Sequence, residues 1–422
     1  MARALAGGRA DDPRAIARDA LLSLLLALPI FAFWRVVLQL GATAIDLYPT
    51  FVAGRLLASG HDSAVYHSVL WAHGDTLSPL WRAMMQAHHI GRADSTYVYG
   101  PAYLWLMLPL TTAWSWSYFK LFWLGLCALS AAFIGISCMT LAGRTPWQWR
   151  AAGALLAASS FGSYYGTALG QNVLPALALT LLGYRLYVRA GHVAGLAPLL
   201  LALLFKPWLV LFLPALLWLG RVRGCAVLAV SYAALQLGLP SLVSPALLQG
   251  YLGTLKRLSG ASLVDYNNVS LRAFIHRNAW EEWPNYASAY AAMDLPASLY
   301  TIEYVALALV ALLALGLTVK VRPSGDTVFC ASLCLLLLPL GICWTHYLVL
   351  SLPACILLSF GDHPERARRS VGVLGLCMLL LPLPWVFASL PSVDLAHAAL
   401  WSVLLLVPWL ITLLLGNTVL TA

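Results

Sequence analysis

The sequence predicts an all-α polytopic membrane protein. Of its 422 residues, 61% are hydrophobic and 10% are charged, whereas about 25% of the residues in a soluble domain are charged. Apolar runs of about 20 residues recur along the chain, and a helix of that length crosses about 30 Å of hydrocarbon. The net charge is +9, but the basic residues are scattered between the apolar runs. This pattern orients membrane helices and predicts no nucleic-acid partner.

Twelve membrane spans are predicted by counting the apolar runs in chain order. If these spans alternate in direction, most arginines and lysines between them fall on one side of the membrane. That side is the cytoplasm by the positive-inside rule, and it includes residues 1–19. The predicted spans are 20–42, 117–142, 151–169, 172–189, 193–205, 206–220, 224–242, 298–319, 326–344, 346–360, 370–390 and 397–416.

Two segments leave alternatives open. The run 100–116 is apolar over only about 14 residues, a length more typical of an interfacial helix than of a span. It is predicted to be interfacial, because a span there would reverse the sidedness of Arg150. The runs 193–205 and 206–220 are either two short spans or one long kinked span. Treating them as two keeps the arginines that flank the pair on the same side.

This topology divides the chain into three parts after its cytoplasmic N-terminus. Residues 20–242 form a seven-span module that includes an outward loop at 43–116. Residues 243–297 form a second outward loop, and residues 298–422 form a C-terminal module of five spans. Both outward loops are too polar to lie in lipid, so they are expected to form most of the mass outside the membrane.

Polar residues collect at the outward ends of the predicted spans. A polar or ionisable side chain near lipid is costly and usually faces a cavity or a partner. A single polar site at the outer membrane surface therefore explains these residues better than a polar path through the bilayer. They are Asp46, Gln171, Asn172, Lys206, Asn267, Asn268 and His346.

Asp46 is the predicted general base. A carboxylate beside the low-dielectric interface is suited to taking a proton near neutral pH. In the same loop Tyr48, Arg55 and Tyr99 supply phenols and a cation, which suit sugar hydroxyls and a phosphate. The alternative is that Asp46 is an ordinary helix cap at the end of a span.

Lys206 and His346 are predicted to meet an anion at the membrane surface. Lys206 is flanked by apolar residues in LALLFKPWLVLF, so its ammonium either snorkels to the surface or binds an anion such as a lipid phosphate. His346 in ICWTHYLVL lies next to Trp344 and Tyr347 and is a candidate to hydrogen-bond a phosphate or acceptor. The alternative is that Trp344 and Tyr347 at this level simply form an interfacial aromatic belt. The histidines of the first outward loop match no ligand spacing, so no metal site is predicted.

The order of several motifs resembles glycosyltransferase family 87. Members of this family are polyprenyl-phosphate-mannose-dependent mannosyltransferases with the GT-C membrane fold. The similarity runs from about residue 40 to residue 355. The motifs are Asp46-x-Tyr48, VAGRLLASG (52–60), Tyr66, YVYGPAYLWLMLPL (97–110), GQN (170–172), LLFKPWLVLFLPALL (203–217), NNVSLRAFIHR (267–277) and WTHYLVLSLPA (344–354).

The resemblance implies roles for individual residues. Asp46 corresponds to the catalytic aspartate, and Gln171, Asn172 and Lys206 line the donor site. His346 matches the histidine of a late span. Asn268, Ser270 and Arg272 belong to the second outward loop, where they contact the acceptor or the loop itself, as Tyr48 and Tyr99 do in the first. Arg55 is a further candidate for binding the donor phosphate.

The resulting prediction is a membrane glycosyltransferase of the GT-C type. It moves a hexose, with mannose preferred, from a polyprenyl-phosphate sugar to a lipid or glycan acceptor, with inversion at the anomeric carbon. The donor is a substrate, so no cofactor is predicted, and the other partners are membrane lipids. The expected location is a bacterial inner membrane, with the site facing the periplasm. The alternative is a polytopic transporter or lipid flippase, for which mid-span polar residues and inverted repeats are expected.

Overall fold

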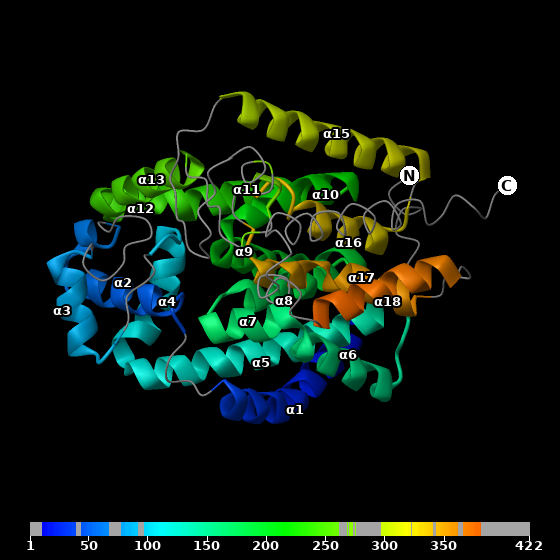
Figure 1. Cartoon of the computed structure of the whole chain (residues 1–422), viewed down its shortest axis with the longest axis horizontal. Helices are drawn as coiled ribbons and strands as arrows, with labels where there is room; N and C mark the ends of the chain where they lie inside the picture. The colour runs from blue at the N-terminus through cyan, green and yellow to red at the C-terminus, as the bar shows by residue number, and fades with distance from the viewer. Residues whose placement is uncertain are drawn as a thin grey trace, which may run out of the picture.

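The computed structural model is a helical bundle (Figure 1). Pairing of extended segments within the described residues is limited to one antiparallel bridge, between Asn268 and Trp344. The prediction of a helical membrane protein is therefore confirmed. The structure describes residues 11–38, 44–66, 77–91, 97–260, 268, 270–272, 275, 297–321, 323–340, 343–361 and 366–380.

The helices vary widely in length. They are α1 (Pro13–Val37), α2 (Tyr48–Ala58), α3 (Pro79–Ala87), α4 (Pro101–Ala113), α5 (Trp116–Leu141), α6 (Trp147–Ser159), α7 (Phe161–Leu169), α8 (Val173–Gly183), α9 (Leu196–Phe205), α10 (Leu213–Trp218), α11 (Val222–Ala233), α12 (Leu239–Val243), α13 (Pro245–Gly260), α15 (Ala297–Val321), α16 (Gly325–Leu335), α17 (Leu352–Phe360) and α18 (Arg366–Leu380). Two π-helical segments, Tyr184–Arg189 and Ala234–Gly238, extend α8 and join α11 to α12. Four short 3-10 segments are Asp62–Ala64, Val193–Gly195, Pro207–Phe212 and Thr345–Ser351.

Four described helices are long and apolar enough to cross a membrane: Pro13–Val37, Trp116–Leu141, Val222–Val243 and Tyr300–Val321. The other predicted spans correspond to shorter or interrupted helices or extend beyond the described residues, so the count of twelve remains a prediction. The span predicted at 397–416 lies wholly outside the described residues. Helix α4, with 13 residues, is only about 20 Å long, which is too short to span and agrees with the interfacial prediction.

Local capping explains where helix boundaries differ from the prediction. Helix α1 begins at Pro13 rather than at residue 20, because the Asp12 side chain accepts a hydrogen bond from the amide of Arg14 and proline occupies the first helical position. The predicted span 151–169 is divided into α6 and α7. Ser160 has extended backbone angles there, and its hydroxyl accepts a hydrogen bond from the amide of Ser163.

The described parts of the two segments predicted to face outward lie together at one end of the bundle. In Figure 1, α5 and α15 run from left to right, and α2, α3, α4, α12 and α13 gather at the left end. The side chain of Ser244, before α13, donates a hydrogen bond to the carboxylate of Asp62 in the first outward segment. Arg257 of α13 donates to the carbonyl of Tyr66 over 3.5 Å. The described parts of these two segments therefore contact each other directly.

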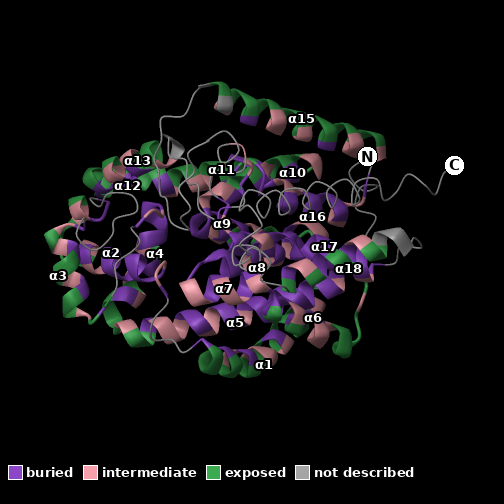
Figure 2. Ribbon diagram, viewed as in Figure 1, coloured by how far each residue is buried: buried purple, intermediate pink, exposed green. Residues whose placement is uncertain are grey.

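The outer faces of several helices are apolar. Figure 2 shows α1 and α15 with much exposed surface, whereas α5, α8 and α17 are largely buried. Exposed leucines, valines and aromatic residues cover α1, including Leu24, Leu28 and Phe33, and Leu309 and Leu312 lie on α15. Apolar faces of this extent suit contact with lipid tails.

Two glycines allow α5 and α6 to pack closely. A Cβ atom on Gly135 would lie 2.0 Å from the carbonyl oxygen of Gly153, and a Cβ on Gly153 would lie 2.5 Å from that of Gly135. Membrane helices commonly approach through such small residues because the hydrophobic effect gives no drive for association within lipid. This contact brings the backbones of α5 and α6 close together.

A buried ion network joins α1 to the centre of the bundle. Arg185 lies 2.8 Å from both Asp11 and Asp19, and Arg150 lies 2.7 Å from Asp19. Arg189 pairs with Asp11 at 3.2 Å and also with Asp326 of α16. The three guanidinium groups and three carboxylates balance in charge. Their ion pairs connect α1, α6, the π-helical extension of α8 and α16. These arginines contribute to the bundle as well as to its orientation. The network is made by Asp11, Asp19, Arg150, Arg185, Arg189 and Asp326.

The glycine contact gives a stability prediction. Gly153→Ala is expected to lower the free energy of unfolding by about 1–3 kcal/mol, because the new methyl group overlaps the Gly135 backbone and forces α5 and α6 apart. Thermal unfolding of the purified protein in detergent, followed by tryptophan fluorescence, measures the change. Gly316→Ala on α15 is the control, since nothing lies within 4 Å of the added methyl group. Equal melting temperatures for the two variants would contradict the prediction.

Candidate active site

Asp46 lies on a turn that is fastened to the end of α7. The turn runs from Ala44 to Leu47 and leads into α2. The amide of Asp46 donates to the carbonyl of Leu169 over 2.9 Å, and the amide of Ala44 donates to Ala168 over 2.8 Å. These bonds position Asp46 beside the connection between α7 and α8, 125 residues away in the chain.

Gly170 makes this close approach possible. Its φ angle is +78°, which lies in the left-handed region that favours glycine. A Cβ on Gly170 would lie 2.4 Å from the Cβ of Leu47, the residue after Asp46. Gly170 therefore ends α7 and leaves room for the Asp46 turn at the same time.

A chain of hydrogen bonds connects Asp46 to Lys206. The Nε2 atom of Gln171 donates to Oδ2 of Asp46 over 2.7 Å. Nζ of Lys206 donates to Oε1 of Gln171 over 3.0 Å and to the phenol oxygen of Tyr347 over 3.2 Å. Three predicted site residues from distant parts of the sequence are thus brought into direct contact, in the order Asp46, Gln171, Lys206.

Lys206 is buried at a break between helices. Helix α9 ends at Phe205, Lys206 has an extended backbone, and Pro207 begins the 3-10 segment that leads to α10. The lysine side chain is only 2% exposed. Its ammonium also lies 5.4 Å from the ring centre of Tyr99 and 4.7 Å from that of Tyr347. Aromatic faces at such distances stabilise a cation.

Asn172 and His346 border this group. Nδ2 of Asn172 donates to the carbonyl of Phe205 over 2.7 Å, which fixes the backbone just before Lys206. His346 is 1% exposed, and neither ring nitrogen has a hydrogen-bond partner among the described residues. Its ring meets that of Tyr347 at 4.6 Å, edge to face.

A row of aromatic rings runs from the outward segments to Lys206. Neighbouring ring centres are 5.4 Å apart for Tyr66 and Tyr97, 5.8 Å for Tyr97 and Tyr99, and 5.0 Å for Tyr99 and Tyr103. Burial raises the pKa of the Tyr99 phenol well above its usual value, and Tyr103, Tyr347 and Asp46 raise it further. Tyr99 is therefore a neutral hydrogen-bond donor near pH 7.

Four other predicted residues have structural partners elsewhere. Arg55 donates to the carbonyl of Trp114 over 2.8 Å, and Arg272 forms a 2.9 Å ion pair with Glu303 of α15. Oδ1 of Asn268 accepts hydrogen bonds from the amides of Ser270 and Cys343, so it fastens the second outward segment to the loop before His346. Tyr48 is buried in the first turn of α2.

Sequence reasoning gave no site role to Tyr347 or Gly170. Tyr347 was read as a member of an interfacial belt, although it directly follows His346 in the motif WTHY. Gly170 was noted only as part of the motif GQN. The positive φ angle and the contact with Leu47 that explain it depend on the fold.

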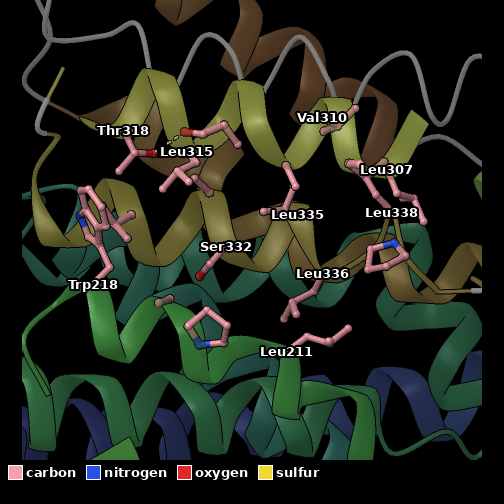
Figure 3. A pocket seen from close by; sticks show the side chains of 18 residues that line it. Leu211, Trp218, Leu307, Val310, Leu315, Thr318, Ser332, Leu335, Leu336 and Leu338 are labelled. Atoms are coloured by element: carbon pink, nitrogen blue, oxygen red, sulfur yellow. Dashed lines mark hydrogen bonds between the residues drawn. The ribbon is translucent and has the colours of Figure 1, made fainter. Parts of the chain in front are cut away.

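An apolar cavity of about 500 Å³ lies among α10, α15 and α16 (Figure 3). Leu211 lines it and belongs to the 3-10 segment that begins directly after Lys206. Trp218, at the end of α10, also lines the cavity. Thr318 and Ser332 donate to carbonyls of their own helices, so their hydroxyls are satisfied. The cavity therefore suits a hydrocarbon chain.

The described residues contain no group of three or more histidine, cysteine, aspartate or glutamate side chains that could hold a metal ion. The site offers one carboxylate, one ammonium and several neutral polar groups. This set can accept a proton at Asp46 and stabilise an anion near Lys206.

The chain matches the family model described as glycosyltransferase family 87 over residues 97–345, more than half of its length. No curated protein and no solved structure matches it. The matched region includes Tyr99, Gln171 and Lys206, whereas Asp46 precedes it and His346 directly follows it. The match favours the transferase prediction over the transporter or flippase alternative.

The fit at Gly170 gives a second stability prediction. Gly170→Ala is expected to lower the melting temperature and to weaken the Asp46–Gln171 contact. The added methyl group would overlap Leu47, and a non-glycine residue in the left-handed backbone conformation costs about 1–2 kcal/mol in addition. Gly191→Ala is the matched control: Gly191 has a φ angle of +73°, but nothing lies within 4 Å of an added methyl group. Thermal unfolding in detergent compares them, and an equal loss in both variants would show that the Leu47 contact does not matter.

Proposed function

The chain belongs to glycosyltransferase family 87, and we propose that it transfers a hexose, with mannose preferred, from a polyprenyl-phosphate sugar to a lipid or glycan acceptor. The observation that carries the proposal is the hydrogen-bonded chain from Asp46 through Gln171 to the buried Lys206. It places a proton acceptor and a cation a short distance apart. We place this chemistry on the outer face of a bacterial inner membrane, within a GT-C-type arrangement of about twelve spans.

In this proposal Asp46 takes the proton of the acceptor hydroxyl as that oxygen attacks the anomeric carbon. The bond between the anomeric carbon and the phosphate oxygen breaks, and the phosphate leaves with the electron pair. Attack opposite the leaving group inverts the anomeric centre in one displacement. The protein positions the two substrates and stabilises the departing charge, which are the main contributions expected when no covalent intermediate forms.

Lys206 is the residue proposed to stabilise the leaving phosphate. Its ammonium is buried, where a charge interacts more strongly than in water, and the ring nitrogens of nearby His346 have no partner among the described residues. Arg55 is a weaker candidate than the sequence suggested, because its guanidinium bonds the carbonyl of Trp114. Gln171 and Asn172 fix the surroundings of Lys206.

The apolar cavity supports a lipid-linked donor. Its lining includes Leu211, in the 3-10 segment that directly follows Lys206, and Trp218 at the end of α10 (Figure 3). A polyprenyl phosphate has a charged group at the end of a hydrocarbon chain, so the ammonium and the cavity together fit its two parts. On the acceptor side we place Tyr48, Tyr99, Asn268 and Arg272, which belong to the two outward segments.

The proposed base gives a direct test. Asp46→Asn is expected to fold normally but to lose at least about 100-fold in transfer rate, because the amide cannot accept the proton. The assay incubates radiolabelled polyprenyl-phosphate mannose with purified protein in liposomes made from lipids of a deletion strain, and labelled products are identified by mass spectrometry.

Asp62→Asn is the control, since Asp62 lies in the same outward segment and bonds Ser244 instead. It is expected to keep its transfer rate. Transfer by Asp46→Asn at the wild-type rate would exclude Asp46 as the base. Wild-type protein that moves the donor across liposomes without forming a glycoside would overturn the transferase proposal.

A further inference from the structure

Gln171 separates the two opposite charges of the site. Its side-chain amide lies between the carboxylate of Asp46, at 2.7 Å, and the ammonium of Lys206, at 3.0 Å. No direct ion pair between Asp46 and Lys206 is present; the amide bonds each of them. This arrangement is unusual for a buried lysine, for which an adjacent carboxylate is the simplest partner.

The chemistry of the two neighbours fixes the orientation of the amide. An ionised carboxylate only accepts hydrogen bonds, and an ammonium only donates them. A rotated amide would place its oxygen against Asp46 and its NH₂ group against Lys206, and both contacts would be lost. Gln171 is therefore held in one orientation by the same charges that it keeps apart.

The backbone of Gln171 is also fixed. Its amide donates to the carbonyl of Gly166 over 2.8 Å, and its carbonyl accepts a bond from the indole of Trp123 over 3.3 Å. The Trp123 ring stacks on Phe205, the residue before Lys206. The spacer and the lysine that it contacts are thus supported by one packed unit, so Gln171 cannot withdraw without disturbing both.

A direct ion pair would disable the proposed chemistry. Opposite charges inside a protein attract strongly, and the long lysine side chain has the freedom to close on Asp46 if the space between them is empty. Asp46 would then be a poorer proton acceptor, and Lys206 would not be free for a phosphate. We propose that Gln171 is a positioning residue that prevents this ion pair and so keeps the base and the phosphate-binding cation separately usable; the inference rests on the proposed function.

Among the described residues, three other titratable groups interact with Asp46 or Lys206. Tyr99 and Tyr347 face Asp46, and His346 lies near Lys206. Tyr99 remains a neutral phenol because its burial raises its pKa. A change in the electrostatic interaction between Asp46 and Lys206 should therefore change the pH at which Asp46 itself titrates.

Two substitutions of Gln171 test the inference in opposite directions. Gln171→Ala lets Lys206 approach Asp46, so the carboxyl should lose its proton at a pH lower by about 1 to 3 units, as expected for an opposite charge within about 4–6 Å. Gln171→Glu places a second carboxylate beside Asp46, so the proton should be lost at a higher pH. The titration is followed by infrared difference spectroscopy of the carboxyl band in liposomes, with Asp46→Asn as the spectrum that lacks it.

The transfer assay gives a second readout. Both variants should lose roughly 100-fold in rate, the effect of small displacements at a site that depends on position. The acidic limb of the pH–rate profile should move with the infrared titration, to lower pH for Gln171→Ala and to higher pH for Gln171→Glu. A merely structural role for Gln171 would not move the two variants in opposite directions.

Gln236→Ala is the matched control. Gln236 is as well buried as Gln171, and its side-chain oxygen accepts a bond from the amide of Ala102, so its loss should leave the Asp46 titration unchanged. Shifts that are absent, or that have the same sign in both Gln171 variants, would overturn the inference. If the wild-type protein transfers no sugar, the proposed function fails, while the infrared titration still decides the role of Gln171.

Discussion

The buried ammonium of Lys206 constrains the backbone and the side chains around it. A charge removed from water must be hydrogen-bonded or paired, because its desolvation otherwise costs several kcal/mol. The chain meets this requirement by ending α9 at Phe205, by supplying Gln171 and Tyr347 as acceptors, and by placing aromatic rings beside the cation. Helices α7, α8 and α9, the 3-10 segment before α17 and the first outward segment all meet at this one group.

Two of the buried groups of charged side chains among the described residues are built on opposite plans. In the network around Arg185, guanidinium groups and carboxylates touch directly and balance in number, which leaves no charge for a ligand. At the candidate site the carboxylate and the ammonium are held apart by an amide, and the ring nitrogens of His346 have no hydrogen-bond partner among the described residues. The first arrangement suits a structural tie and the second suits a site that must receive an anion and a hydroxyl.

The sequence predicted the centre of the candidate site better than its edges. Asp46, Gln171 and Lys206 were grouped because charge placed each at the outward end of a span, and the structure brings them together over 160 residues of chain. The partners of Arg55 and Arg272 were not predictable, since Trp114 and Glu303 become neighbours only through packing. The division at Ser160 was missed because a single capping serine hardly changes the hydrophobicity of the run around it.

Because hydrophobicity does not reveal such local breaks, long continuous helices were easier to predict than the number of spans. Helices α5 and α15 are continuous apolar segments whose length alone identifies them. At the site the backbone must instead break, because breaks at Gly170 and Lys206 bring polar groups of different helices to one level. Irregular backbone at membrane depth is tolerated where it is buried in protein or lines a cavity. The interruptions that hide the topology in the sequence are thus the same features that bring these polar groups together, and the 3-10 segment that follows Lys206 also lines the apolar cavity.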